Sequence, residues 1–326
     1  MNSHGENPPR VVVGIDFSSH SMAAARWTAR WIPRDSELVL VHALVIPEMG
    51  SRLPKRYPPS ATLLENARAG ADRRLRELSA SIGFPRVWIQ VGEGRPAEVI
   101  ARAAREFTAE IVVVGMHGEG GRTRGYPGRT ADQLVRISPV PVLLATGTLQ
   151  EAPHVITVAL TSSSVSPHIV EWTRRFHQRF DSRVAAIHVI GSKVLAHVLS
   201  MAAVTQGSAP ITQHEIDRLF ATEREGWIQQ LVGAGIPPSA VTCEIAFGEV
   251  AEQVLAAAKR HAAGMIVMGS HAGPVRRALL GSSASAVLRH SEIPVLVVLE
   301  PQDSTLRNDS TTESFEKTER LAGVAG

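Results

Sequence analysis

Short runs of aliphatic residues recur along the chain and predict strands that are buried on both faces. In the first half they cover residues 11–13, 39–41, 111–114 and 142–144. Segments with helical spacing lie between the runs. One helical face is Leu64, Ala67, Ala71, Leu75 and Leu78, and its later counterpart is Ile216, Phe220, Trp227 and Leu231. This alternation predicts an α/β fold with a parallel, doubly wound sheet.

The second half of the sequence repeats the first. The best-matched pairs are Trp27 with Trp172, His42 with His188, Gly115 with Gly269 and Pro141 with Pro294. Each copy predicts five strands separated by four helices, so we expect two Rossmann-like domains. Each domain is predicted to be a five-stranded parallel sheet with helices on both faces, at residues 10–147 and 153–300. The short join between them predicts that the copies pack together.

Both ends of the chain, residues 1–9 and 301–326, carry few large apolar side chains and are predicted to be disordered tails. No apolar run reaches the ~18 residues of a membrane helix, and the first residues lack the basic-then-apolar order of a signal peptide. The single cysteine, Cys243, excludes a disulfide framework and a cysteine-based metal cluster. We therefore expect a cytoplasmic protein that does not span a membrane.

The charge of the chain is nearly balanced, at +3 with histidine neutral. The basic residues are mostly scattered arginines, with no run of five or more. Nucleic-acid-binding proteins usually concentrate positive charge on one face or segment, so this pattern argues against DNA or RNA as a partner.

A glycine-rich segment follows the fourth predicted strand. Six of the fourteen residues from 115 to 128 are glycine, and Arg122, Arg124 and Arg129 add positive charge. Glycine lets backbone N–H groups approach a ligand closely, and a helix begins directly afterwards with free N-terminal donors. In open parallel sheets this loop lies where ligands bind. The segment therefore predicts a phosphate site, with a merely flexible surface loop as the alternative.

The usual nucleotide and hydrolase motifs are missing. None of the four lysines follows a glycine, which excludes a Walker loop, and the first strand runs into GIDFSSHS instead of GxGxxG. No GxSxG elbow is present. If the glycine-rich segment binds phosphate, it therefore does so as a different kind of loop.

These features together resemble the universal stress protein family. The resemblance rests on VVVGIDFS, LVLVHAL, GEGRPAEVI, the GMHG loop and PVPVLLA, and it covers nearly all of residues 10–300, twice. The family's nucleotide motif is GxxG, nine residues, then Gly followed by Ser or Thr. Gly115, Gly118 and Gly128 match it. Arg129 departs from it, because the hydroxyl comes one place later at Thr130.

The resemblance implies that the chain binds ATP, with Mg²⁺ arriving on the nucleotide. Asp16 would contact the adenosine, the backbone of Ala43 the adenine, and the residues after Gly128 the triphosphate. Arg129 would either replace a hydroxyl contact by a charged one or crowd the site, and the strong negative charge of a triphosphate favours the first. The full set of candidate binding residues in the first copy is Gly14, Asp16, Ala43, Gly115, Met116, His117, Gly118, Arg122, Gly128, Arg129 and Thr130.

The second copy departs further from the motif. Thr161 stands where Asp16 does, Ala272 replaces the second glycine, and eight residues instead of nine precede Gly281. Whether this copy binds nucleotide therefore stays open. Its candidate binding residues are Val189, Gly269, Ser270, His271, Gly281, Ser282 and Ser283.

Other conspicuous residues have structural interpretations. We interpret His42 and His188, each at a strand end, as structural imidazoles, and the Trp27 and Trp172 pair as core. Cys243 is interpreted as an inert buried thiol. No Cys, Asp or His lies at metal-ligand spacing from the repeated histidines, His42 with His188 and His117 with His271, so we predict no protein-bound metal.

The leading functional hypothesis is an ATP-binding regulator of the stress response, which binds nucleotide without turning it over quickly. No general base is evident near the γ-phosphate, so no catalytic residue is assigned. The alternatives are a slow ATPase or nucleotide-dependent transferase, and a scaffold with degenerate pockets. The resemblance also implies that the two domains pair through their fifth strands within one chain. Assembly into a homo-oligomer stays open.

Overall fold

The structure is a computed structural model. It describes residues 8–45, 61–118, 128–146, 152–160, 166–191, 218, 220–270 and 280–299. The predicted tails therefore lie outside the described residues, apart from Pro8 and Pro9. None of the described helices is both long and apolar enough to cross a membrane.

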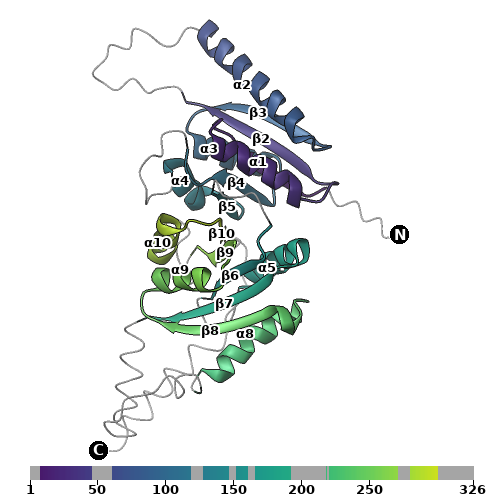
Figure 1. Ribbon diagram of the computed structural model, residues 1–326. Helices are drawn as coiled ribbons and strands as arrows, with labels where there is room; N and C mark the ends of the chain where they lie inside the picture. The colour runs from purple at the N-terminus through teal and green to yellow at the C-terminus, as the bar shows by residue number, and fades with distance from the viewer. Residues whose placement is uncertain are drawn as a thin grey trace, which may run out of the picture.

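The first half alternates strands and helices as the aliphatic runs predicted (Figure 1). Its elements are β1 (Arg10–Gly14), α1 (Ser19–Trp31), β2 (Glu37–Leu44), α2 (Ala61–Ile82), β3 (Val87–Glu93), α3 (Pro96–Glu106), β4 (Ile111–Gly115), α4 (Arg129–Ile137) and β5 (Val142–Ala145). The strands are parallel and lie in the order β3-β2-β1-β4-β5. The strand order reverses between β1 and β4, so a crevice forms beyond their carboxyl ends.

The second half repeats this arrangement. Its elements are β6 (Val155–Leu160), α5 (Pro167–Phe180), β7 (Arg183–Ile190), α8 (Ala221–Gly233), the 3₁₀ turn η1 (Pro238–Ala240), β8 (Val241–Phe247), α9 (Val250–Arg260), β9 (Met265–Gly269), α10 (Ser282–His290) and β10 (Val295–Val298). The strand order β8-β7-β6-β9-β10 matches that of the first half. The predicted fold class, two doubly wound domains with five parallel strands each, is confirmed.

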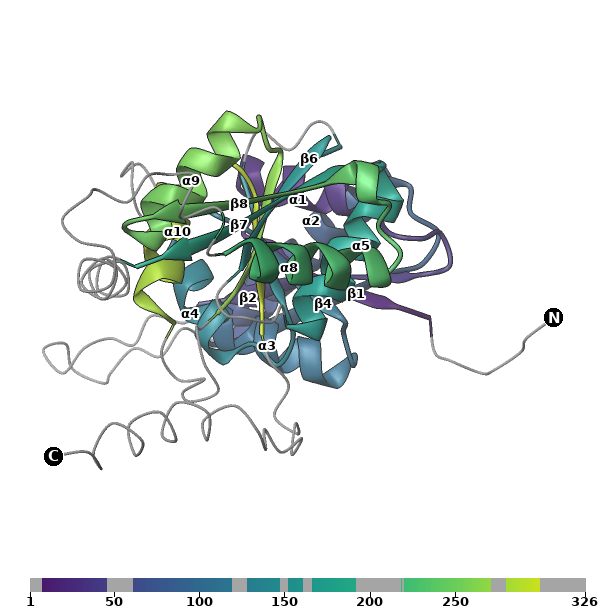
Figure 2. The ribbon, with the colours of Figure 1, turned by 90° about the horizontal axis from the view of Figure 1, so that it is seen from below.

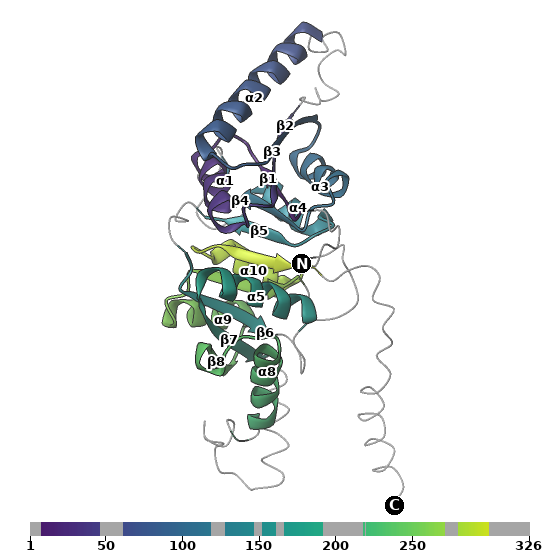
Figure 3. The ribbon, with the colours of Figure 1, turned by 90° about the vertical axis from the view of Figure 1, so that its right-hand side faces the viewer.

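The two halves share one ten-stranded sheet, because β5 and β10 run side by side and antiparallel (Figure 3). Leu143 lies opposite Leu296, and these two leucines occupy equivalent positions in the repeat (296 − 143 = 153). A pair of equivalent residues that face each other marks a local two-fold axis. The halves are therefore related by a pseudo-two-fold axis at the centre of the sheet.

Each face of the sheet carries its own hydrophobic core. Helices α1, α2, α5 and α8 cover one face, and α3, α4, α9 and α10 cover the other. Figure 2 shows α9 and α10 on the opposite side of the sheet from α5. Trp27 and Trp172 are buried in the first of these cores, as predicted, with 3% and 8% of their surfaces exposed.

The predicted apolar face of α2 is only partly buried. Ala71, Leu75 and Leu78 pack in the core, but Ala67 is exposed and Leu64 is half-buried. The first turns of the 22-residue helix extend past the sheet (Figures 1 and 3). The helical spacing was correct, but it could not show how far the sheet beneath the helix extends.

Across the pseudo-two-fold axis, α1 and α5 meet through aromatic side chains. The rings of Trp31 and Phe176 lie 5.2 Å apart between centroids, and those of Trp27 and Phe180 lie 6.0 Å apart. Arg179 donates hydrogen bonds to the backbone oxygens of Trp31 and Arg30, at 2.5 and 2.6 Å. The end of the first-half helix is thus capped by the second half.

Cys243 lies on β8 and is half-buried. Burial raises the pKa of its thiol to about 12. A thiol that stays protonated at neutral pH is a poor nucleophile, which agrees with its interpretation as inert.

The aromatic contact predicts a measurable loss of stability. Phe176→Ala should lower the free energy of unfolding by about 3–5 kcal/mol, because it opens a cavity between the halves. Trp88→Ala is the control: Trp88 is 52% exposed, so its removal should cost less than about 1 kcal/mol. Urea unfolding followed by circular dichroism measures both, and equal losses would contradict the assignment.

Candidate functional site

A cavity of about 520 Å³ opens at the carboxyl ends of β1, β2 and β4, where the strand order reverses. Its lining comes from the first half: Gly14, Ile15, Asp16, Ser21, Val41, His42, Ala43, Val45, Pro96, Ile100, Val114, Gly115, Gly118, Gly128, Arg129, Thr130 and Ala131. One side of the cavity is largely apolar, from β2 and α3. The opposite side is formed by glycines and the start of α4.

Asp16 supplies a carboxylate to this cavity. Its Oδ1 atom accepts hydrogen bonds from the backbone N–H of Ser18 at 3.0 Å and from the Ser18 hydroxyl at 2.6 Å. Burial opposes ionisation, but hydrogen bonds from Ser18 and Ser21 outweigh it and hold the pKa of Asp16 below its ordinary value. The carboxylate is therefore charged at neutral pH and can accept hydrogen bonds from hydroxyl or amino groups of a ligand.

The start of α1 holds this carboxylate in place. Ser18 is the N-cap residue of α1, and its hydroxyl also accepts a hydrogen bond from the backbone N–H of Ser21 at 3.2 Å. The same serine therefore caps the helix and orients Asp16. This local arrangement follows from the sequence DFSSHS, because serine is among the preferred N-cap residues.

Gly118 approaches Asp16 so closely that no side chain fits between them. A Cβ atom at position 118 would lie 2.7 Å from Oδ2 of Asp16. Oδ1 is held by Ser18, so the carboxylate cannot turn away without losing those hydrogen bonds. The second glycine of the GxxG motif is thus required by the position of the carboxylate.

The helix α4 begins at the edge of the cavity. Its N-cap residue is Gly128, whose N–H donates to the backbone oxygen of Met116 at 2.8 Å. The first helical hydrogen bond is made by the N–H of Asp132, so the amides of residues 129–131 have no helical partner. Those three residues line the cavity, which makes this helix end suited to an anion.

His42 and His117 lie near the same cavity, and His188 is the second-half equivalent of His42. His42 donates from Nδ1 to the backbone oxygen of Ile15 at 2.7 Å, and its ring lies 4.6 Å from that of Phe17. His188 makes the equivalent hydrogen bond to Leu160 at 3.2 Å. Both rings thus make the backbone hydrogen bond expected of a structural imidazole, although His42 also lines the cavity. His117 lies 6.3 Å from His20 between ring centroids, beside the cavity.

The structure brings eight of the eleven first-copy candidates together around the cavity: Gly14, Asp16, Ala43, Gly115, Gly118, Gly128, Arg129 and Thr130. Met116 has a fully buried side chain in the core, so only its backbone faces the loop. His117 lies next to the lining residues. Arg122 and Arg124 lie outside the part of the chain that the structure describes.

The sequence reasoning missed several lining residues. Ser21 and Ile100 are examples, and only Ser21 had a signal in the sequence. Ser21 lies three positions after the N-cap serine, and Ile100 packs against Gly14, where an added Cβ would meet Cδ1 of Ile100 at 2.6 Å. Residue 14 must therefore be small, a constraint visible only after α3 is placed over β1.

The second half keeps the helix end but not the whole site. Gly281 caps α10 and donates to the backbone oxygen of Ser270 at 3.0 Å, as Gly128 does to Met116. The backbone angles of the two glycines agree within 2°. Val189, Gly269, Ser282 and Ser283 are described and partly accessible, and Ser270 is buried. Thr161, His271 and Ala272 lie outside the described residues.

Chemically, the first-half cavity combines a charged acceptor, an apolar wall and a helix end rich in donors. This combination suits a ligand with an apolar ring system, hydroxyl groups and an anionic end. Among the residues described, no group of three or more His, Cys, Asp or Glu could hold a metal ion.

Comparisons with known proteins show what the chain as a whole is similar to. A model of the universal stress protein family matches residues 8–146 and again residues 153–298. Universal stress protein Rv2005c of Mycobacterium tuberculosis is 26% identical over 311 residues, covering 88% of this chain and 96% of the relative. A universal stress protein of Mycolicibacterium smegmatis is 28% identical over 298 residues, with the same coverage.

Solved structures show the same fold. The crystal structure of a universal stress protein from Archaeoglobus fulgidus aligns with a TM-score of 0.59 at 16% identity, covering 90% of this chain and 97% of that one. A universal stress protein solved in complex with cAMP aligns with 44% of this chain at 20% identity and a TM-score of 0.32. Because the family model matches both halves almost completely, the chain belongs to the universal stress protein family and carries two copies of its domain.

Proposed function

We propose that this tandem universal stress protein binds ATP in its first domain and acts as a nucleotide-dependent regulator of the stress response. We place the two domains at residues 10–147 and 153–300. Binding, rather than fast catalysis, is the proposed activity. The proposal rests on one observation: Asp16, Gly118 and the N-terminus of α4 meet at a single cavity.

Each part of that cavity has a proposed partner in the nucleotide. The Asp16 carboxylate accepts hydrogen bonds from the sugar hydroxyls, and the backbone of Ala43 recognises adenine beside the apolar wall of Ile100 and Val41. The free amides at the start of α4 and the Arg129 guanidinium bind the phosphates. Mg²⁺ accompanies the triphosphate.

The properties of Asp16 favour a binding role over a catalytic one. It is the one acidic side chain among the described lining residues, and its lowered pKa makes it a weak base. A weak base does not activate water efficiently. A slow ATPase or nucleotide-dependent transferase remains the alternative function.

The second domain is proposed to retain phosphate contacts through the start of α10, with weaker overall binding because Thr161 replaces the carboxylate. We propose a cytoplasmic location. We further propose that the β5–β10 pairing is the intramolecular equivalent of a dimer contact in the family, which leaves a homo-oligomer as a further level of assembly.

Gly118→Ala should weaken ATP binding roughly tenfold to a hundredfold, because the added Cβ displaces the Asp16 carboxylate from its hydrogen bonds. Isothermal titration calorimetry measures the affinity, and mass spectrometry identifies nucleotide that co-purifies. Gly70→Ala is the matched control, since a Cβ there meets nothing within 4 Å. Equal affinities in the two variants would refute the assigned site.

The proposed contacts predict different effects for substitutions of Asp16 and of Arg129. Asp16→Ala should weaken adenosine and ATP by a similar factor, whereas Arg129→Ala should weaken ATP roughly tenfold and leave adenosine nearly unchanged. The reason is that Asp16 is assigned to the nucleoside and Arg129 to the phosphates. Titrating both ligands into each variant provides the measurement. A uniform loss with Arg129→Ala would show that Arg129 does not act on phosphate.

The rate of ATP hydrolysis distinguishes a binding regulator from an enzyme. With ATP in excess over the purified chain, we expect phosphate release too slow to give repeated turnovers within minutes, because the one carboxylate in the described part of the cavity is a weak base. Thin-layer chromatography of radiolabelled ATP follows the reaction, with Asp16→Ala for comparison. Several turnovers per minute, abolished by Asp16→Ala, would instead establish the enzyme.

A further inference from the structure

A second cavity, of about 590 Å³, lies where α1 and α2 end. This is the opposite end of the strands from the Asp16 cavity. Its described lining is Arg26, Ala29, Arg30, Ile32, Pro33, Arg34, Ser81, Ile82 and Arg179. Four of these nine residues are arginines, and none is acidic. Arg179 comes from α5 in the second half, so the cavity spans the two domains.

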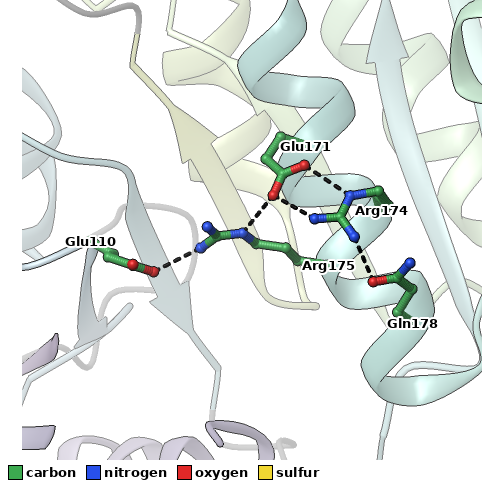
Figure 4. Close-up of polar contacts among 5 residues, drawn as sticks. All are labelled: Glu110, Glu171, Arg174, Arg175 and Gln178. Atoms are coloured by element: carbon green, nitrogen blue, oxygen red, sulfur yellow. Dashed lines mark hydrogen bonds and ion pairs between the residues drawn. The ribbon is translucent and has the colours of Figure 1, made fainter. Parts of the chain in front are cut away.

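The pseudo-symmetric surface of the second half shows how such arginines can be neutralised. Arg175 on α5 donates to Glu171 on the same helix at 2.8 Å and to Glu110 of the first half at 2.7 Å (Figure 4). Glu171 also binds Arg174, and hydrogen bonds from Arg174 lower the pKa of Glu171 to about 2. Both arginines therefore face charged carboxylates.

Neither carboxylate has a counterpart on the first-half side. Arg30 is the repeat equivalent of Arg175, but Arg26 occupies the position of Glu171 (171 − 26 = 145). Gly264 occupies the position of Glu110 (264 − 110 = 154). On the second-half side of the pseudo-two-fold axis, two acids neutralise the arginines. On the first-half side, an arginine stands in place of the first acid and a glycine in place of the second.

Arg26, Arg34 and Arg179 have donors left for a ligand. Arg26 makes no hydrogen bond or ion pair with any residue that the structure describes. Arg34 lies over the ring of Phe84, with 5.8 Å from Cζ to the ring centroid, which holds the guanidinium in place without neutralising it. Arg179 uses Nε and Nη2 on backbone oxygens, and its Nη1 has no partner within the described ranges.

Helix ends offset only part of this charge. The C-termini of α1, α2 and α5 lie at or near the cavity, and each carries about half a negative elementary charge. Three such ends supply roughly 1.5 negative charges against the three guanidinium groups of Arg26, Arg34 and Arg179. A substantial positive charge therefore remains in a concave site.

We propose that this arginine pocket, lined by Arg26, Arg30, Arg34 and Arg179, binds a small-molecule ligand that carries two or more phosphate groups. Guanidinium groups bind phosphate oxygens in a bidentate manner, and several of them from separate elements match a multivalent anion better than a single phosphate. The pocket is separate from the ATP cavity. Because Arg179 belongs to the second domain, the ligand bridges the two domains.

Inorganic pyrophosphate is the probe. Calorimetric titration into the full chain at low salt should detect binding, and Arg26→Glu should weaken it roughly tenfold or more, because it restores the acid found at the equivalent position 171. Arg73→Glu is the control, since Arg73 is exposed on α2, has the same charge change and does not line the pocket. It should change the affinity less than about twofold, because distant exposed charges are screened.

Two results would overturn the proposal: no pyrophosphate binding at millimolar concentration, or an equal loss of affinity in the two variants. ATP itself carries several phosphates and competes for either site, so a substitution in the nucleotide cavity, Arg129→Ala, distinguishes the two. Binding that is kept with Arg129→Ala and lost with Arg26→Glu supports the pocket, whereas binding that is lost with Arg129→Ala and kept with Arg26→Glu assigns pyrophosphate to the nucleotide cavity and refutes it.

Discussion

The antiparallel contact between β5 and β10 is the interaction on which the arrangement of this protein depends. It joins two parallel five-stranded sheets into one, and the facing leucines, Leu143 and Leu296, place the pseudo-two-fold axis. Once that axis is set, α1 and α5 must meet on one face of the sheet. The aromatic contact of Trp31 with Phe176 and the capping of α1 by Arg179 are consequences of that meeting. A site at this junction exists only because the two domains are held together.

The cavity beyond β1 and β4 depends on a different constraint, the absence of side chains. Gly118 gives the Asp16 carboxylate room, while the start of α4 is held beside Met116 by the backbone N–H of Gly128. Backbone amides form the proposed anion-binding part of the site, so it would tolerate changes of side chain that would destroy a lysine-based loop. This explains how the second domain keeps the same geometry at Gly281 although its sequence has drifted from the motif.

Much of the fold could be predicted from the sequence because its signals are local. Aliphatic runs such as 111–114 marked buried strands, and the repeat showed that each pattern occurs twice. The equivalent histidines, His42 and His188, make the backbone hydrogen bonds expected of structural imidazoles, and the signal was that both recur at a strand end. The limits of local information appear at α2, where Ala67 continues the helical pattern but projects past the sheet. Spacing determines which face of a helix is apolar, not how long its neighbour is.

The arginine pocket could not have been predicted in this way, because its meaning lies in a comparison between two surfaces. Arg26 and Gly264 are unexceptional in the sequence, and they are far apart along it. Their significance appears only when the pseudo-two-fold axis maps them onto Glu171 and Glu110, the two acids that neutralise Arg175. A duplicated chain can lose such pairs in one copy while the other keeps the junction stable. Loss of both acids on one side, together with a guanidinium at Arg26 that no described residue neutralises, leaves positive charge at the junction and favours the binding of an anion there.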